Sequence, residues 1–256
     1  MLLSRLTGVS VLGLALLLGA CSSTPEKEKV AEQPAAELYK ESQIRMEDGN
    51  YRSAIAHLEA LLSRYPFGPH ADQAQLDLIS AYYASADNPA ALASIDRFIR
   101  LNPTHKDIDY ALYMRGLVNE DEDRNYFQEL FRIDRSDRDP HNIREAFGDY
   151  ERLLREYPGS KYAPDAALRM TALKNRLARY EVQVAEYYYA RDAFVASLGR
   201  GKYVLEYMPD TPEVERALEL MALCYEELGM EKAQQDTLRV LKLNYPDNEM
   251  VLTVGS

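Results

Sequence analysis

The side chains that could do catalytic chemistry are few and lie far apart along the chain. The four histidines are His57, His70, His105 and His141, and they form neither an HExxH motif nor a pair at metal-binding spacing. The sequence has no glycine-rich phosphate loop and no G-x-S-x-G turn for a nucleophilic serine. Acidic pairs such as Glu120 with Asp121 are interpreted as solvated helix faces. We therefore expect no catalytic residues, no metal site and no cofactor.

Cys21 is the one residue whose setting predicts a covalent modification. Residues 1–20 are typical of a secretory signal peptide, with Arg5 before an apolar run at 11–18. That run is too short to span a bilayer, which takes about 20 apolar residues. The tetrapeptide LGAC at 18–21 resembles a bacterial lipobox, in which small residues admit the signal peptidase and the cysteine thiol carries diacylglycerol. The alternative is an ordinary signal peptide with an incidental cysteine.

The residues after Cys21 indicate where a lipid-anchored protein would be sent. One acyl chain holds a protein to a membrane only marginally, but bacterial lipoproteins resemble one another in carrying three. Ser22 stands where retention in the inner membrane usually needs Asp. By this resemblance the protein is expected at the outer membrane, facing the periplasm. Residues 21–35 are polar, charged and proline-bearing, which is typical of a flexible tether.

Composition excludes two further classes of protein. The formal net charge of -11 argues against nucleic-acid binding, which needs a basic surface. Cys224, the second cysteine, lies in the apolar pattern of a late helix. With Cys21 acylated it has no partner, so we expect a buried core residue and no disulfide framework. The 19 tyrosines would suit either helical packing or a protein-binding surface.

A repeated helix organises the rest of the chain. The segment 51–66 (YRSAIAHLEALLSRYP) places apolar residues at spacings of three and four and ends at a proline, and the same register returns at 143–158. The prolines that end successive copies stand at 66, 103, 158, 209 and 246. A tetratricopeptide repeat has a period of about 34 residues. The spacing therefore predicts an all-α, tetratricopeptide-like superhelical solenoid of about five helix pairs.

Two of the steps between these prolines are too long for a plain repeat. They indicate insertions of roughly 15 to 20 residues relative to the tetratricopeptide period. The first is a loop at 121–140, which separates N-terminal repeats at 36–120 from C-terminal repeats at 141–256. It mixes aromatic residues with alternating charges, so it could fold back onto the repeats or dock a partner. The second lengthens a helix that begins near Pro164 to about 25 residues, beyond the usual 11 or 12.

The second helix of the fourth pair departs most from the repeated pattern. Gly199 and Gly201 flank Arg200 there, and Gly201 replaces the usual large residue. Each glycine inside a helix costs roughly 1 kcal/mol relative to alanine. The pair would either weaken the helix or permit another backbone to approach closely. Arg200 is accordingly expected to be either a solvated side chain or a contact for a partner protein.

Several stretches resemble the BamD (YfiO/ComL) family of outer-membrane barrel-assembly lipoproteins. They are RYPFGP (64–69), AQLDLI (74–79) with AYY (81–83), DRFIRLNPTH (96–105), DY (109–110) with YMRGL (113–117), DRSDRDP (134–140), LARYE (177–181) and VAEYY (184–188). The similarity is specific, because generic repeats share only small and apolar positions. Departures from the family pattern gather at 120–128 and beyond about residue 202.

This resemblance implies a scaffold that is not an enzyme. C-terminal repeats of this family would hold the periplasmic POTRA domains of a BamA-like barrel insertase and a BamE-like lipoprotein, and a BamC-like lipoprotein would lie along the body. In this family an arginine of the fourth pair contacts BamA, and Arg200 occupies that place. The N-terminal repeats would receive the C-terminal signal of unfolded outer-membrane proteins, which ends in an aromatic residue.

The first two repeats offer side chains suited to such a signal. They are four aromatic residues and one cation, which fit an aromatic side chain followed by a carboxylate: Tyr39, Arg64, Tyr65, Phe67 and Tyr82. Any of these could instead pack the core. The alternative function is a different tetratricopeptide lipoprotein that scaffolds cell-wall enzymes or pilus assembly. A periplasmic hydrolase is a third class, for which the chain offers no set of catalytic residues.

Overall fold

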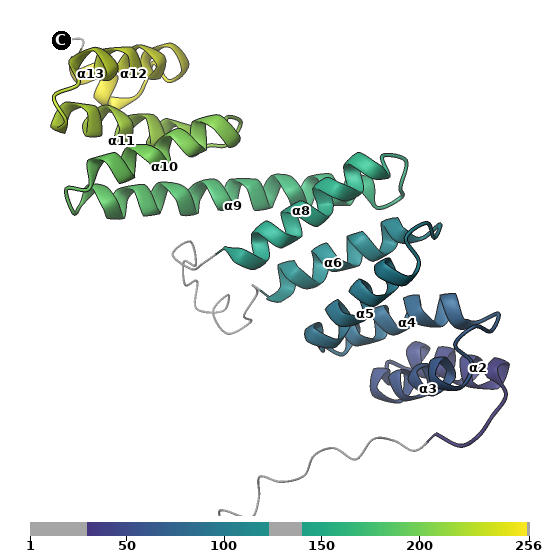
Figure 1. The fold of residues 1–256 in the computed structure, drawn as a ribbon. Coiled ribbons are helices and arrows are strands. Elements are labelled where there is room, and N and C mark those ends of the chain that lie inside the picture. Colours follow the sequence, from purple (N-terminus) through teal and green to yellow (C-terminus); the bar gives the residue numbers. More distant parts are fainter. Residues whose placement is uncertain (1–29, 123–139, 255–256) are drawn as a thin grey trace, which may run out of the picture. The chain divides into compact units, whose positions relative to one another are not determined.

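The structure is a computed structural model that describes residues 30–122 and 140–254 of the 256-residue chain. Every regular element in these two ranges is a helix (Figure 1), which confirms the all-α prediction. Cys21 and residues 123–139 of the predicted loop lie outside the described ranges. The helices are α2 (Ala35–Glu47), α3 (Tyr51–Arg64), α4 (Ala71–Ala84), α5 (Asn88–Leu101), α6 (Ile108–Glu122), α8 (His141–Glu156), α9 (Ala163–Tyr189), α10 (Phe194–Tyr207), α11 (Val214–Glu227), α12 (Glu231–Asn244) and α13 (Glu249–Val254).

The chain divides into two compact units, Met1–Ser85 and Ala86–Ser256. In the first unit α2 packs on α3 and α3 on α4. Local signals place the turn between α2 and α3. Gly49 takes a φ of +71° after the end of α2, and the Asn50 side chain accepts a hydrogen bond from the backbone N–H of Ser53 to cap α3. The core of this unit is a buried cluster of Leu38, Leu58, Leu61, Ala74, Leu78 and Ala81.

In the second unit each helix packs against the next one along the chain. These packed neighbours are α5 and α6, α6 and α8, α8 and α9, α9 and α10, α10 and α11, and α11 and α12. The predicted helix pairs α6 with α8, α9 with α10 and α11 with α12 are therefore present, as α2 with α3 is in the first unit. The tetratricopeptide-like fold class is confirmed. Cys224 is fully buried, as its apolar neighbours predicted.

The five prolines end their helices through the residue before them. Those residues are Tyr65, Asn102, Tyr157, Met208 and Tyr245, and their φ angles all lie between -128° and -136°. A proline ring clashes with a preceding residue in helical conformation and pushes it toward extended backbone. The same local cause therefore sets the same end in each repeat, which is why the sequence alone located these boundaries.

Helix α9 is the longest in the described residues, with 27 residues from Ala163 to Tyr189 (Figure 1). Its length agrees with the expected 25 or so. The helix that follows, α10, has only 14 residues, and α9 also packs against α8 and α11. Two helices besides α10 therefore help to cover α9, an arrangement that the pairwise repeat pattern did not predict. No helix in the described ranges is both long enough and apolar enough to cross a membrane.

Two glycines allow neighbouring helices to approach closely. A Cβ added at Gly201 would lie 2.7 Å from Cγ of Met221 and 3.3 Å from the backbone oxygen of Ala217, so another backbone does approach closely here, which was one of the two expectations for this position. A Cβ at Gly116 would lie 2.4 Å from the ring of Tyr150. Tyr150 is fully buried on α8, so Gly116 on α6 provides the room for its ring. An alanine at either site would force the facing side chain or its helix to shift.

Candidate functional site

The described residues contain no group of three or more His, Cys, Asp or Glu side chains that could hold a metal ion. The side chains that the sequence singled out lie in two places, one in each compact unit. Those in the first unit are Tyr39, Arg64, Tyr65, Phe67 and Tyr82. The residue in the second unit is Arg200.

Arg64 and Tyr65, at the end of α3, hold the segment that precedes α2. The guanidinium of Arg64 donates through Nη1 to the carbonyl of Ala31 at 2.7 Å and through Nη2 to the carbonyl of Val30 at 2.8 Å. The hydroxyl of Tyr65 donates to the carbonyl of Gln33 at 3.1 Å. The Val30 side chain packs against the core cluster of the first unit. These contacts fix residues 30–33, here called the docked segment, on the first helix pair.

Tyr39 connects α2 to α4. Its ring stacks on His70 with 4.9 Å between centroids, and its hydroxyl donates to Oδ2 of Asp77 at 2.9 Å. The amide of Gln43 donates to the same carboxylate oxygen at 2.7 Å. Burial, followed by the hydrogen bond to Asp77, raises the pKa of Tyr39 to about 12. Tyr39 is therefore bound into the interface between two helices.

Tyr82 and Phe67 lie in contrasting environments. The Tyr82 hydroxyl donates to Oε1 of Glu59 at 2.6 Å, and its ring packs against the same core cluster as Tyr39 does. Phe67 lies in the turn between α3 and α4 with 99% of its surface exposed. The structure thus brings Arg64 and Tyr65 together on the docked segment, and it places Tyr39 and Tyr82 against a shared core. Phe67 is left in solvent two residues beyond Tyr65.

Sequence reasoning missed the acceptors that these side chains use. The three groups that accept hydrogen bonds from Arg64 and Tyr65 are backbone carbonyls, which every residue carries. They belong to a stretch whose composition indicates a flexible tether, and its Val30 side chain packs on the core cluster instead. The apolar Val30 within that polar stretch is the one feature that could have suggested that the stretch packs on the helices.

Arg200, on α10, is tied to a buried carboxylate. Its Nη1 donates to Oε2 of Glu181 at 2.8 Å, while Nη2 of Arg144 lies 3.3 Å from Oε1 of the same residue. The Glu181 side chain is 3% exposed, whereas those of Arg200 and Arg144 are 40% and 46% exposed. The hydrogen bond to Glu181 is the main cause that raises the pKa of Arg200 above its ordinary value. One carboxylate of α9 therefore orients cations from α10 and α8.

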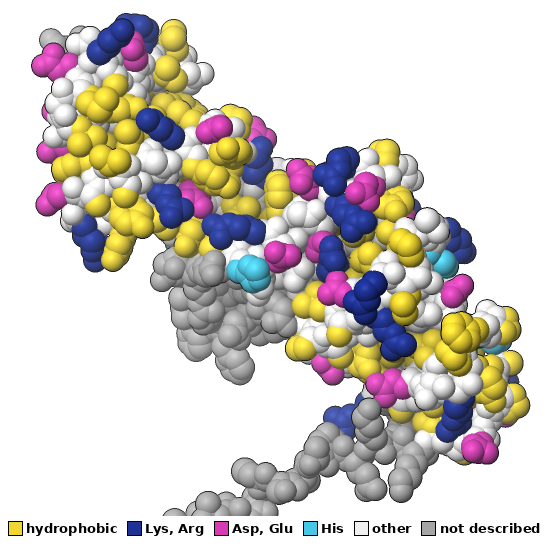
Figure 2. Space-filling view, viewed as in Figure 1, with side chains coloured by type: hydrophobic (Ala, Val, Ile, Leu, Met, Phe, Trp, Pro, Cys, Tyr) yellow, Lys and Arg dark blue, Asp and Glu magenta, His cyan; other side chains and the backbone are white. Residues whose placement is uncertain are grey.

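Hydrophobic side chains reach the surface of the same helix. On α10, Val195 is 71% exposed, Tyr203 40% and Tyr207 57%, and the two tyrosine rings lie 4.7 Å apart. Figure 2 shows hydrophobic side chains gathered between scattered charged ones over the C-terminal helices. A surface that combines aromatic residues with an oriented arginine has the composition found at the centre of protein interfaces.

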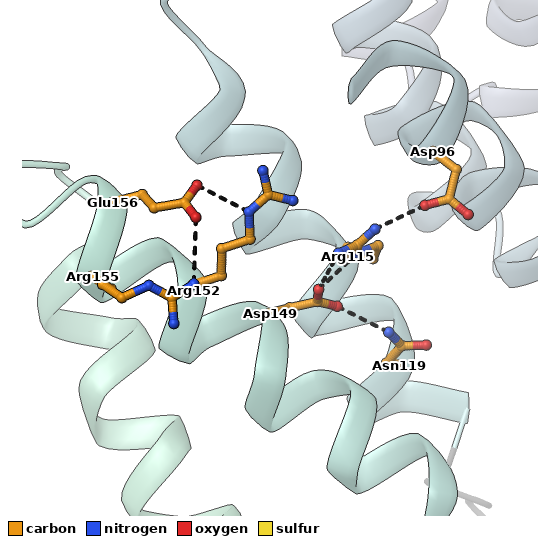
Figure 3. A network of polar contacts seen from close by, with 7 residues as sticks. All are labelled: Asp96, Arg115, Asn119, Asp149, Arg152, Arg155 and Glu156. Atoms are coloured by element: carbon orange, nitrogen blue, oxygen red, sulfur yellow. Dashed lines mark hydrogen bonds and ion pairs between the residues drawn. The ribbon is translucent and has the colours of Figure 1, made fainter. Parts of the chain in front are cut away.

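A third polar cluster joins α5, α6 and α8 (Figure 3). Arg115 donates through Nε to Oδ1 of Asp149 at 2.8 Å and through Nη1 to Asp96 at 3.0 Å, and Asn119 donates to the other oxygen of Asp149 at 3.2 Å. Burial raises the pKa of Asp149 although the ion pair with Arg115 opposes this. Every polar atom of the Asp149 carboxylate is engaged, so this cluster holds helices together.

The structure corrects one interpretation of the acidic residues. Glu120 was expected on a solvated helix face, but its side chain is only 12% exposed. Its Oε2 accepts hydrogen bonds from Arg169 at 3.0 Å and from the hydroxyl of Tyr150 at 3.2 Å. A carboxylate next to another acidic residue in sequence gave no sign of these partners, which come from α8 and α9.

Comparison with known proteins shows the family to which the chain belongs. Residues 31–241 match the family described as YfiO, outer membrane lipoprotein. A protein of Vibrio cholerae serotype O1 named outer membrane protein assembly factor BamD is 46% identical over 234 residues, which covers 91% of this chain and 96% of the relative. A protein of the same name from Neisseria meningitidis serogroup A is 41% identical over 237 residues, covering 92% and 89%. The chain therefore belongs to the YfiO family of outer membrane lipoproteins, as the sequence resemblance predicted.

Proposed function

We propose that this protein is a non-catalytic scaffold in the assembly of outer-membrane β-barrel proteins. The names of its relatives, outer membrane protein assembly factors at 46% and 41% identity over nearly the whole chain, support this function. The protein would be held at the periplasmic face of the outer membrane by lipid on Cys21. The LGAC tetrapeptide and the family description as an outer membrane lipoprotein support that location.

The second unit would dock the POTRA domains of a BamA-like barrel protein through Arg200. The observation that carries this proposal is the geometry of the arginine itself. Glu181 holds one edge of the guanidinium, and 40% of the Arg200 side chain remains open to solvent. A guanidinium has five N–H donors in a rigid fork, so a partner carboxylate could bind those that face outward. BamE-like and BamC-like lipoproteins would be further partners of the same assembly.

The first unit would receive unfolded outer-membrane proteins. Its Arg64 can bind a carboxylate, and the exposed Phe67 ring and the partly exposed Tyr65 offer aromatic surface beside it. Tyr39 and Tyr82 would contribute the parts of their rings that the core cluster leaves accessible. Arg64, Tyr65 and Phe67 place the proposed site at the C-terminal end of α3 and in the turn that follows it.

A pulldown from detergent extracts through a tag on this chain tests the scaffold function. The parent protein should retain a large heat-modifiable β-barrel protein that carries POTRA domains. Arg200→Glu should weaken that capture at least tenfold, because it places a second carboxylate beside Glu181 and repels an acidic partner. The matched control is Arg144→Glu, which contacts the same Glu181 from α8 and should retain the barrel protein.

Two results would contradict these assignments. If both charge reversals weakened capture equally, Glu181 and the local packing would be responsible, and Arg200 would not be the docking residue. If the parent retained only cell-wall enzymes or pilus subunits, the protein would be a different tetratricopeptide scaffold. Circular dichroism of each variant would show whether the helical fold persists.

A further inference from the structure

The docked segment is held mainly by contacts that do not depend on its sequence. Residues 30–34 lead into α2 without helical structure of their own. Three of their carbonyls, those of Val30, Ala31 and Gln33, accept hydrogen bonds from Arg64 and Tyr65. The Val30 side chain adds an apolar contact with the core cluster. Backbone hydrogen bonds plus one apolar contact are how proteins commonly bind extended peptides.

The chain's own residues are an imperfect ligand for this site. The two terminal nitrogens of the Arg64 guanidinium donate to neutral carbonyls. A negatively charged carboxylate would accept both hydrogen bonds and bind the guanidinium more strongly. Oε1 of Gln33 is buried and accepts no hydrogen bond from any residue that the structure describes. A buried acceptor without a partner costs free energy. The fully exposed ring of Phe67 adds aromatic surface that the docked segment does not cover.

We propose that residues 30–33 act as a built-in competitor for a peptide-binding site formed by Arg64 and Tyr65. The ligand that displaces them is an extended peptide whose C-terminal carboxylate replaces the carbonyls of Val30 and Ala31 on Arg64. This inference rests on the proposed reception of unfolded outer-membrane proteins by the first unit. It adds that reception is regulated, because every incoming peptide must first release the docked segment.

The physical basis of the competition is the covalent link between the segment and α2. Because Ala35 begins α2, residues 30–33 are always near their site and rebind at a high effective concentration. A peptide that presents only backbone carbonyls forms no stronger hydrogen bonds to Arg64 than the docked segment does. It also loses translational and rotational entropy on binding, which the tethered segment does not. A free carboxylate shifts that balance, so the site selects chain ends over internal stretches of unfolded chain.

Peptide binding to the whole processed chain, purified in detergent, tests the competition. The probe is a short fluorescent peptide that ends in phenylalanine with a free carboxylate, and its twin ends in a carboxamide. Val30→Asp places a charge against the apolar core cluster and should release the segment. If the segment is docked in about 80% of molecules, its release should tighten binding of the carboxylate peptide about fivefold.

Two further variants make the measurement specific. Ala31→Asp introduces the same charge one residue away, on an exposed position that leaves the backbone carbonyls in place, and should bind like the parent. Arg64→Gln should bind the carboxylate peptide more weakly than the parent does. It should also lose the preference for the carboxylate over the carboxamide, since glutamine carries no charge.

Proteolysis of the unmodified protein gives a second readout. Trypsin cuts after lysine, and the Lys29–Val30 bond lies at the start of the docked segment. The carboxylate peptide, which contains no lysine or arginine, should speed cleavage at this bond because it displaces Val30. The carboxamide twin should have little effect at the same concentration.

The outcomes separate this inference from the function on which it rests. If Val30→Asp, Ala31→Asp and the parent bound the carboxylate peptide equally, and the peptide left cleavage unchanged, the segment would not compete and the inference would be overturned. Reception of the peptide would still stand in that case. If no variant bound the peptide at all, both the competition and the proposed reception by the first unit would be wrong.

Discussion

Arg64 and Arg200 are the two arginines on which the proposed partner contacts depend, and their surroundings differ in kind. Arg64 lies on the surface and binds two neutral backbone carbonyls of the docked segment. Arg200 is anchored by the charged carboxylate of Glu181, which is 3% exposed and also binds Arg144. One arginine holds acceptors that another molecule could replace. The other holds an acceptor that is almost completely buried.

This difference suggests two modes of recognition within one chain. A neutral acceptor at the surface exchanges readily for a carboxylate, so Arg64 suits a ligand that arrives and leaves. A buried carboxylate loses its solvation and cannot be left unpaired cheaply, so Arg200 keeps its orientation whether or not a partner is bound. A fixed guanidinium loses little conformational entropy on docking, which suits a long-lived subunit contact.

Removing the buried carboxylate should have the largest effect on stability. Glu181→Ala leaves a small cavity and two arginines without their shared acceptor, and should lower the free energy of unfolding by about 2 to 3 kcal/mol. Glu186→Ala is the control on the same helix. Its ion pair with Arg216 joins side chains that are 42% and 46% exposed, so the loss should be within about 0.5 kcal/mol. Urea unfolding followed by circular dichroism measures both, and equal losses would show that Glu181 is not a structural anchor.

Neutralising Arg200 or Arg64 should lower the free energy of unfolding less than Glu181→Ala does, and the loss should be larger for Arg200. Arg200→Gln removes a charged donor from Glu181 while Arg144 remains, and should cost about 1 kcal/mol. Arg64→Gln removes hydrogen bonds at the surface and should change the free energy of unfolding by less than about 0.5 kcal/mol. The same urea titration compares the two variants. A loss in Arg64→Gln as large as that in Arg200→Gln would mean that the docked segment is a structural part of the first unit.

High pH should affect the first unit through Tyr39, whose hydroxyl donates to Asp77. Its folded pKa of about 12 lies above the ordinary value of 10.0, because burial and Asp77 disfavour the phenolate. The stability that this hydroxyl contributes is therefore complete below pH 10 and is lost as the pH rises toward 12. The urea midpoint of the parent should fall relative to that of Tyr39→Phe across this range. Parallel midpoints from pH 9 to pH 12 would show that Tyr39 is not coupled to folding.

Local chemistry explains why so much of the fold could be predicted. Each terminating proline forces the residue before it out of the helical region. Gly49 adopts the positive φ needed in the turn after α2 because glycine has no Cβ. The length of α9 followed from apolar residues that recur at spacings of three and four from Ala166 to Tyr187. These features depend on residues next to one another in the chain, so no knowledge of the packing was needed.

The polar partners could not be predicted, because they come from distant parts of the chain. Glu181 is surrounded by a pattern that fits either a solvated or a buried side chain, and only the approach of α8 and α10 to α9 buries it. Glu120 was misread for the same reason, since Tyr150 and Arg169 come from α8 and α9. The contact of Gly116 with the Tyr150 ring likewise joins two helices that are far apart in the sequence.

The sequence by itself determined the repeated helices and their ends, the tetratricopeptide-like class and the family. Each of these follows from periodicity, from proline and glycine geometry, or from short motifs, all of which act over neighbouring residues. Tertiary structure alone decided what each arginine holds. Arg64 meets backbone carbonyls, which have no signature in a sequence, and Arg200 meets a carboxylate whose strength as an anchor comes from burial. Burial is a property of the packed chain. The sequence could therefore single out Arg64 and Arg200 as candidates, but it could not show which groups they bind.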